Sequence, residues 1–176
     1  RESAEQATIR ALALDLLERL SGASQANCER IVRVHGAALL CGGMFDASDP
    51  AGIARFMERT GYRVELRSDA KGDPVIAGRI SRSDYLMQFY ECEGGSFCNS
   101  IQLIVQVPRP ATLTGDTANA FNARWRYVRI TFDQAQAKLQ MDVNLDASVT
   151  ADNLEDTLDI WRQLVEIFER EILGAR

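Results

Sequence analysis

The residues best suited to chemistry in this chain are its four cysteines. Cys92 and Cys98 enclose a Gly-Gly turn between two strand-like runs. Cys28 and Cys41 lie on either side of a second turn signal, His35-Gly36. Each pair is placed to meet across a hairpin, at the Cα separation of roughly 5.5–6 Å that a disulfide requires. The sequence therefore predicts two local disulfides, and with them an oxidising compartment, periplasmic or secreted.

Other uses of the cysteines stay open. Free thiols would behave as small hydrophobes where they are buried. A zinc site would have to be assembled without a Cys-x-x-Cys motif, and the only histidine, His35, lies in a predicted turn. Thiol–disulfide exchange at Cys92 and Cys98 is the enzymatic alternative. Their spacing is wider than Cys-x-x-Cys, and the neighbouring Glu91 and Glu93 disfavour a thiolate, so a structural bond is the favoured interpretation.

Other candidates for catalysis or metal binding are weak. A Ser-His-Asp or Cys-His arrangement would have to use His35, and histidines in turns are usually solvated. Six acidic residues lack the Asp-x-Asp-x-Asp-Gly spacing of a calcium loop, so we interpret them as a solvated acidic surface. They are Asp142, Asp146, Asp152, Glu155, Asp156 and Asp159. The sequence predicts no catalytic residue, no metal and no cofactor.

Composition excludes two classes of partner. The 176 residues include 20 Lys+Arg and 25 Asp+Glu, a net charge of -5, which gives no electrostatic basis for binding nucleic-acid phosphates. No stretch approaches the roughly 20 consecutive apolar residues of a membrane span. The chain opens at Arg1 without an apolar leader, as it would after removal of a signal peptide.

Hydrophobic periodicity predicts alternating groups of helices and strands. Helices are expected over residues 4–20, 50–60 and 116–125, and from 150 towards the end of the chain. Strands are expected over residues 30–34, 37–41, 62–67, 75–80, 85–90, 101–107, 128–132 and 139–145. Runs of adjacent strands separated by helices predict an α+β fold, with an antiparallel sheet backed by helices on one face. We divide the chain into an N-terminal helix and β-hairpin extension, residues 1–43, and a main domain, residues 44–176.

Two asparagines, Asn119 and Asn122, lie close together on the short helix predicted over 116–125. Asparagine is a weak helix former, so a hydrogen-bonding role is expected. Tying this helix to a neighbouring strand or loop is the favoured role, and a polar recognition patch is the alternative. With the strand predicted over 85–90, this helix supplies the candidate binding surface. The predicted protein-binding residues are Tyr85, Tyr90, Asn119, Phe121, Asn122 and Trp125.

Several runs together resemble the YbjN domain family. They are Gly61-Tyr62-Arg63-Val64, Gly72-Asp73-Pro74-Val75-Ile76, the run from Tyr85 through Phe89-Tyr90 and Cys92 to Cys98-Asn99-Ser100-Ile101-Gln102-Leu103, the segment from Asn119 to Val128, and the helix with Leu154, Leu158, Trp161 and Phe168. Each motif is short, and their order and spacing carry the resemblance. It extends roughly over residues 45–173, about three quarters of the chain.

The resemblance implies a fold like that of the type III secretion chaperones, a curved antiparallel sheet backed by helices. Family members are described as regulators of sensory transduction and are not known as enzymes. Secretion chaperones work in the cytoplasm, whereas the cysteines of this chain indicate a compartment outside it. The resemblance therefore predicts the fold, whereas the cysteines argue against a literal secretion-chaperone role.

Together these observations predict a non-enzymatic protein-binding module, adaptor- or chaperone-like or regulatory, outside the cytoplasm. The expected partner is a protein, and a homodimer is a further expectation because related chaperone folds pair. The alternatives are a thiol–disulfide exchange protein using Cys92 and Cys98, and a small-ligand-binding protein that would need a deep pocket.

Overall fold

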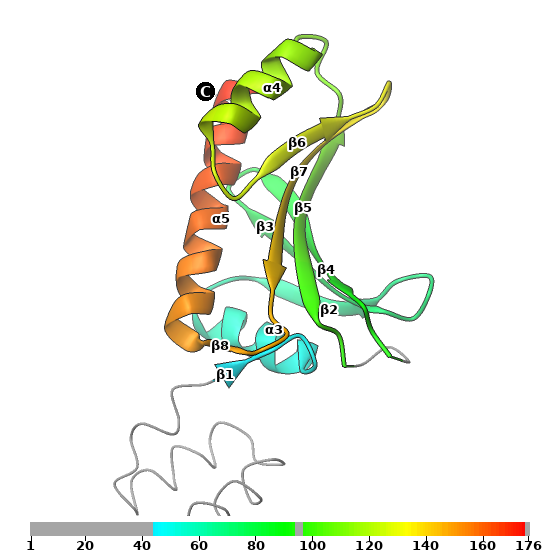
Figure 1. Cartoon of the computed structure of the whole chain (residues 1–176), viewed down its shortest axis with the longest axis vertical. Helices are drawn as coiled ribbons and strands as arrows, with labels where there is room; N and C mark the ends of the chain where they lie inside the picture. The colour runs from blue at the N-terminus through cyan, green and yellow to red at the C-terminus, as the bar shows by residue number, and fades with distance from the viewer. Residues whose placement is uncertain (1–43, 94–96, 175–176) are drawn as a thin grey trace, which may run out of the picture. The chain divides into compact units, whose positions relative to one another are not determined.

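The computed structural model describes residues 44–93 and 97–174, and all of these except Met44 belong to a compact unit, Phe45–Arg176 (Figure 1). The N-terminal helix and hairpin predicted for residues 1–43 lie outside the described residues, and so does the Cys28–Cys41 pair. The elements in chain order are β1 (Met44–Phe45), α3 (Pro50–Arg59), β2 (Val64–Ser68), β3 (Pro74–Ile80), β4 (Ser83–Tyr90), β5 (Ser100–Pro108), α4 (Gly115–Arg124), β6 (Arg129–Phe132), β7 (Gln136–Asn144), β8 (Val149–Thr150) and α5 (Ala151–Glu171).

Six of the strands form one sheet in the order β2-β3-β4-β5-β7-β6, and every neighbouring pair in it is antiparallel. β1 and β8 form a separate two-stranded sheet. The long helix α5 and the shorter α4 lie on one side of the six-stranded sheet, as Figure 1 shows. This arrangement confirms the predicted α+β class and the antiparallel sheet backed by helices.

The helices begin where the sequence places capping side chains. The carboxylate of Asp49 accepts a hydrogen bond from the backbone N–H of Gly52 at 2.8 Å, and Pro50 follows as the first residue of α3. Thr150 caps α5 in the same way, since its hydroxyl accepts from the N–H of Asn153 at 3.2 Å. The predicted starts near 50 and 150 are both confirmed.

The centre of the sheet face under the helices is fully buried. Met87 in β4 lies opposite Ile76 in β3 and opposite Leu103 in β5, and Leu103 lies opposite Met141 in β7. The first three of these side chains have no exposed surface, and Met141 has 3%. This row of apolar side chains across four strands is the floor of the core. We call this side of the sheet the covered face.

Helix α5 supplies the main cover. Its Trp161 and Phe168 are completely buried. Trp161 packs edge-on against Tyr85 of β4, with ring centroids 6.4 Å apart, and Phe168 packs edge-on against Phe121 of α4 at 6.5 Å. Such edge-to-face pairs stabilise beyond the area that they bury, by about 0.5–1.5 kcal/mol each.

A buried carboxylate ties the end of α5 to the β3–β4 turn. Glu169, which is 4% exposed, accepts hydrogen bonds from the hydroxyls of Ser81 at 2.6 Å and Ser83 at 2.7 Å, and from the backbone N–H of Arg82 at 2.9 Å. Burial alone would raise the pKa of this carboxyl. The three hydrogen bonds outweigh that effect and hold the pKa of Glu169 below its usual value.

Candidate functional site, a groove on the uncovered face of the sheet

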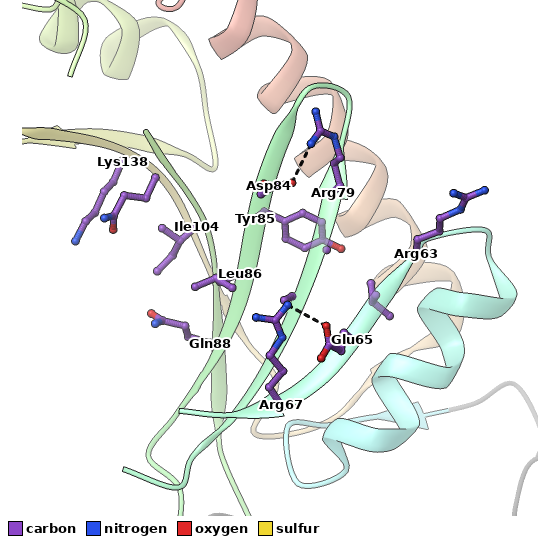
Figure 2. Close-up of a pocket in the computed structure, with 14 residues that line it drawn as sticks. Arg63, Glu65, Arg67, Arg79, Asp84, Tyr85, Leu86, Gln88, Ile104 and Lys138 are labelled. Atoms are coloured by element: carbon purple, nitrogen blue, oxygen red, sulfur yellow. Dashed lines mark hydrogen bonds and ion pairs between the residues drawn. The ribbon is translucent and has the colours of Figure 1, made fainter. Parts of the chain in front are cut away.

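The side of the sheet opposite the helices carries a groove with a volume of about 790 Å³ (Figure 2). We call it the open-face groove. It crosses the sheet from β2 to β7. Its lining residues are Arg63, Val64, Glu65, Arg67, Ala77, Gly78, Arg79, Asp84, Tyr85, Leu86, Gln88, Ile104, Gln106 and Lys138.

Three apolar side chains form the floor of the groove. Leu86 in β4 lies opposite Ala77 in β3 and opposite Ile104 in β5, so the three are one row across neighbouring strands. Their direction follows from strand alternation, since Leu86 stands between two residues that face the core. Leu86 is 39% exposed, and Ala77 and Ile104 are half-buried. No described helix lies above this row.

The rim of the groove is charged. Arg67 pairs with Glu65 on β2 at 3.0 Å, and Arg79 of β3 pairs with Asp84 of β4 at 3.3 Å. All four side chains are more than half exposed. Ion pairs of this kind stabilise a fold by about 0–1 kcal/mol, because water screens them and ordering the side chains costs entropy. Binding can therefore rearrange these pairs at small cost.

Two further basic residues lie at opposite ends of the groove. Figure 2 shows Lys138 of β7 at one end and Arg63, which precedes β2, at the other, with Leu86 and Ile104 closer to Lys138. Neither the Arg63 nor the Lys138 side chain makes a hydrogen bond or ion pair with another described residue. The groove thus gathers four basic and two acidic side chains on a chain whose net charge is -5.

Beside the groove, the same face is closed by a hydrogen-bonded network. Gln102 of β5 donates to the carboxylate of Asp142 and accepts from the amide of Gln140 at 3.1 Å, and it is only 8% exposed. Arg129 pairs with Asp142, and its hydrogen bond lowers the pKa of that carboxyl. The polar groups here are satisfied by one another, which distinguishes this area from the groove.

Of the two tyrosines predicted to bind a partner, only Tyr90 lies on the surface. It is 42% exposed on the uncovered face, and its hydroxyl donates to Gln88 at 2.8 Å. Tyr85 is 2% exposed and points into the core, where its ring covers Gly78 so closely that a Cβ there would lie 2.7 Å from the hydroxyl oxygen. The Tyr85 side chain is therefore part of the core, although the residue also borders the groove.

On α4, two of the predicted protein-binding residues anchor the helix to the rest of the domain. Phe121 is 3% exposed and belongs to the core. The amide of Asn122 donates to the carbonyl of Ile130 at 3.1 Å and accepts from its N–H at 2.7 Å. This pair of hydrogen bonds confirms the predicted tie between the helix and a strand.

The other two predicted residues of this region do not join the groove. Asn119 is exposed on α4, and Trp125, at its C-terminal end, donates from its indole N–H to Glu171 of α5 at 3.4 Å. Both belong to the helical side of the sheet, whereas Tyr90 lies on the other face. The structure therefore brings the six predicted residues to three places rather than to one surface.

Cys92 and Cys98 are joined by a disulfide that closes the connection between β4 and β5. Cys98 is 4% exposed, whereas Cys92 is half-buried. The intervening Phe97 is 68% exposed and has a φ of 52°, an uncommon conformation for a bulky residue. The bond lies at the end of β4 that also carries Tyr90.

Within residues 44–93 and 97–174, no three His, Cys, Asp or Glu side chains are grouped so that they could hold a metal ion. In the same part of the chain, no helix is both long enough and apolar enough to cross a membrane. The acidic residues of α5 and Asp142 instead lie on separate parts of the surface.

The fold and the groove define a class of α+β domain whose antiparallel sheet has helices on one face and an apolar, charge-rimmed groove on the other. The family model for YbjN, described as "putative bacterial sensory transduction regulator", matches residues 49–174. The chain therefore belongs to the YbjN family. No curated protein and no solved structure matched it, so the likeness to type III secretion chaperones stays a prediction.

Proposed function

We propose that this YbjN domain is a non-enzymatic protein-binding module, an adaptor or regulator that holds a partner in the open-face groove outside the cytoplasm. The observation that carries the proposal is the apolar row of Ala77, Leu86 and Ile104, which no described helix covers. The family description supports the proposal, because a regulator of sensory transduction acts by binding a partner and needs a surface for it.

The composition of the row supports the proposal. Where one face of an antiparallel sheet is solvated, its outward positions are usually polar. Here the outward positions of β3, β4 and β5 at the centre of the sheet are Ala77, Leu86 and Ile104. Apolar surface rimmed by charged side chains is typical of an interaction site, since apolar contact supplies affinity and charges supply orientation.

The proposal is tested by photocrosslinking in the native cell. A photoreactive phenylalanine analogue replaces Leu86, and the matched control carries it at Gln163, an exposed position of α5 on the other side of the sheet. We expect one protein to crosslink at position 86 and not at 163, in stoichiometric yield with the folded domain. Mass spectrometry of the crosslinked peptide identifies both partners.

Equal crosslinking at the two positions, or none at position 86 in a protein whose thermal unfolding matches the wild type, would overturn the groove as a docking site. A crosslink confined to position 163 would move the interaction to the helical side. Both results can be interpreted, because Leu86 is exposed and the analogue at this position does not disturb the core.

The extracytoplasmic location is supported by the disulfide between Cys92 and Cys98, because such bonds persist in oxidising compartments. The test labels intact cells with a thiol-reactive polymer before lysis, with the paired Cys92→Ser and Cys98→Ser variants as controls that each free one thiol. We expect no labelling of the wild-type chain without reductant, as two formed disulfides require, and labelling of Cys98→Ser, which frees the half-buried Cys92; the Cys98 freed in Cys92→Ser is buried and should react only after unfolding. Absence of labelling in Cys98→Ser would contradict this location, because the polymer does not enter the cytoplasm, whereas labelling of the wild-type protein would contradict the disulfides.

The same experiment separates a structural bond from thiol–disulfide exchange. An exchange enzyme cycles, so part of its population is reduced in the cell and its dithiol reduces a disulfide substrate. We expect the wild-type protein to remain fully oxidised and to show no reductase activity towards insulin. Sustained insulin reduction that is lost in Cys92→Ser would replace the binding proposal with the exchange alternative.

A further inference from the structure

We infer that the occupant of the open-face groove is an extended peptide segment of a partner protein that carries apolar residues between two acidic residues about six positions apart. This inference rests on the proposed function and names the chemistry that the groove would recognise. It follows from the placement of charge along the groove, its length and the state of the backbone beneath it.

The charges select an acidic occupant. Arg67 and Arg79 each have a carboxylate beside them, whereas Arg63 and Lys138, at the two ends, have no ion-pair partner among the described residues. An occupant with a carboxylate at each end satisfies both basic groups. One with basic ends would face unpaired like charges at both.

The length of the groove sets the spacing of the acidic residues. From β7 to β2 the groove crosses β5, β4 and β3, which is four strand-to-strand steps of about 4.8 Å, or roughly 19 Å. An extended peptide advances about 3.3 Å per residue, so roughly six residues span this distance. In an extended chain, residues at positions 1, 3, 5 and 7 share one face. Acidic residues at 1 and 7 therefore place residues 3 and 5 towards the floor.

The floor selects apolar residues at those two inner positions. Leu86 and Ile104 lie opposite each other on β4 and β5, two residues along these strands from Asp84 and from Gln106, the neighbour of Lys138. Figure 2 shows both side chains between the charged ends of the groove. A leucine at each inner position of the peptide would bury surface against them. Serine there would leave the same surface wet.

The backbone at the centre of the groove excludes recognition by strand addition. β3, β4 and β5 each have hydrogen-bonded neighbours on both sides, so their N–H and C=O groups are already paired. A peptide in the groove is consequently read through side chains, and it lies across the strands rather than beside one.

A second copy of this chain fits the groove less well than such a peptide. The acidic surface of the domain that faces solvent on α5 carries Asp152, Glu155 and Asp156, and these three exposed residues have no large apolar side chain exposed between them. That helix supplies the charge and not the apolar contact. Self-association is therefore an outcome to be tested and not the occupant we infer.

The test uses three labelled heptapeptides and the purified full chain, with binding followed by fluorescence anisotropy. The first peptide is Asp-Ser-Leu-Thr-Leu-Ser-Asp, the second has lysine at both ends, and the third has serine in place of both leucines. We expect the first to bind at least tenfold more tightly than either of the others, with affinity that falls as salt rises from low to high concentration.

Charge reversal then locates the binding site. Arg63→Glu and Lys138→Glu are each expected to weaken the first peptide about threefold to tenfold, since each removes one attraction and adds one repulsion. Lys71→Glu is the matched control, because it makes the same change in charge on an exposed turn between β2 and β3, outside the groove. Urea unfolding of all three variants is expected to coincide with the wild type, which separates lost binding from lost fold.

Equal binding of the first two peptides, or equal loss in the Lys71→Glu control, would overturn the acidic occupant. Equal binding of the first and third peptides would show that charge alone attracts the peptide, and would overturn the apolar positions of the inferred occupant. A dimer seen by light scattering and abolished by Lys138→Glu would assign the groove to a second copy. If position 86 crosslinks to a cellular partner and no heptapeptide binds, the proposed function stands and this inference fails. If neither occurs, both fail.

Discussion

The two faces of the six-stranded sheet use neighbouring residues of the same strand for opposite purposes. Met87 faces the helices and has no exposed surface, whereas Leu86 faces the groove and is 39% exposed. Both are apolar, both lie in β4, and both belong to an apolar row across adjacent strands. The covered row holds the domain together. The uncovered row is less buried, which leaves it available to a partner.

The largest expected effect separates the two faces directly. Met87→Ala is expected to lower the free energy of unfolding by about 2–5 kcal/mol, because it removes buried atoms and leaves a cavity. The matched Leu86→Ala change in the same strand is expected to cost less than about 1 kcal/mol, since much of that side chain is already in water. Urea unfolding monitored by tryptophan fluorescence measures both. Equal losses would mean that the uncovered row is a second core.

The next effect probes the carboxylate that holds α5 on the covered face. Glu169→Gln is expected to lower the free energy of unfolding by about 1.5–3 kcal/mol at pH 7, because it weakens hydrogen bonds to a charged, buried group. Urea titrations of both proteins at pH 7 provide the measurement. Surface substitutions usually change stability by less than about 0.5 kcal/mol, so a difference of that size between the two proteins would show that Glu169 does not secure the helix.

The pH dependence of that difference has a definite sign. The pKa of Glu169 is held below its ordinary value in the folded state. The stabilisation is therefore fully present above the unfolded pKa, near about 4.3, and is lost as pH falls through the lower folded pKa. We expect the wild type and Glu169→Gln to converge in stability as pH is lowered from 7 to 3. A gap that widens on acidification would contradict the hydrogen-bonded carboxylate.

A smaller effect is expected where α4 is tied to β6. Asn122→Ala removes two hydrogen bonds to the backbone of Ile130 and is expected to cost about 1–2 kcal/mol. Asn119→Ala is the control on the same helix, because Asn119 is exposed and is expected to change stability by less than about 0.5 kcal/mol. Thermal unfolding of the two variants side by side would show whether the tie, and not helix propensity, sets the difference.

The smallest effect belongs to the rim of the groove. Arg79→Ala breaks an exposed ion pair with Asp84 and is expected to change stability by less than about 0.5 kcal/mol. Chemical unfolding at low and high salt is the measurement, with the wild type in parallel. A loss comparable to that of Met87→Ala would mean that the rim is a structural element and that the contrast between the two faces is weaker than proposed.

Strand alternation accounts for how much of the fold could be predicted. In β4 the sequence places Tyr85, Met87 and Phe89 on one side and Leu86 and Tyr90 on the other, and the structure agrees. Alternation separates the two sides but does not say that an aromatic residue on the core side is unavailable to a partner. The helices bury the side chain of Tyr85, which alternation alone does not indicate, and its role in binding a partner stays a prediction.

The groove could not be predicted because it depends on register. Arg63 and Lys138 are far apart in the sequence. They line one groove because β5 pairs with β7, so that three strands in a fixed order separate β2 from β7. A one-residue shift in any of these pairings would turn the opposite side chains outward. The available signal was local, namely leucine and isoleucine at outward positions of two strands. Whether these two side chains line a groove depends on which strands lie beside them, and the fold decides that.

The place of α5 at the end of the described chain has a consequence for synthesis. The apolar row under the helices is complete when β7 ends at Asn144, but Trp161 and Phe168 follow later. Ribosomes add about 5–20 residues per second, so the residues that cover this row are added roughly one to five seconds after it. Until α5 is present, the apolar side chains of this row are uncovered and can associate with other unfinished chains. We expect a chain whose translation stops before Trp161 to aggregate.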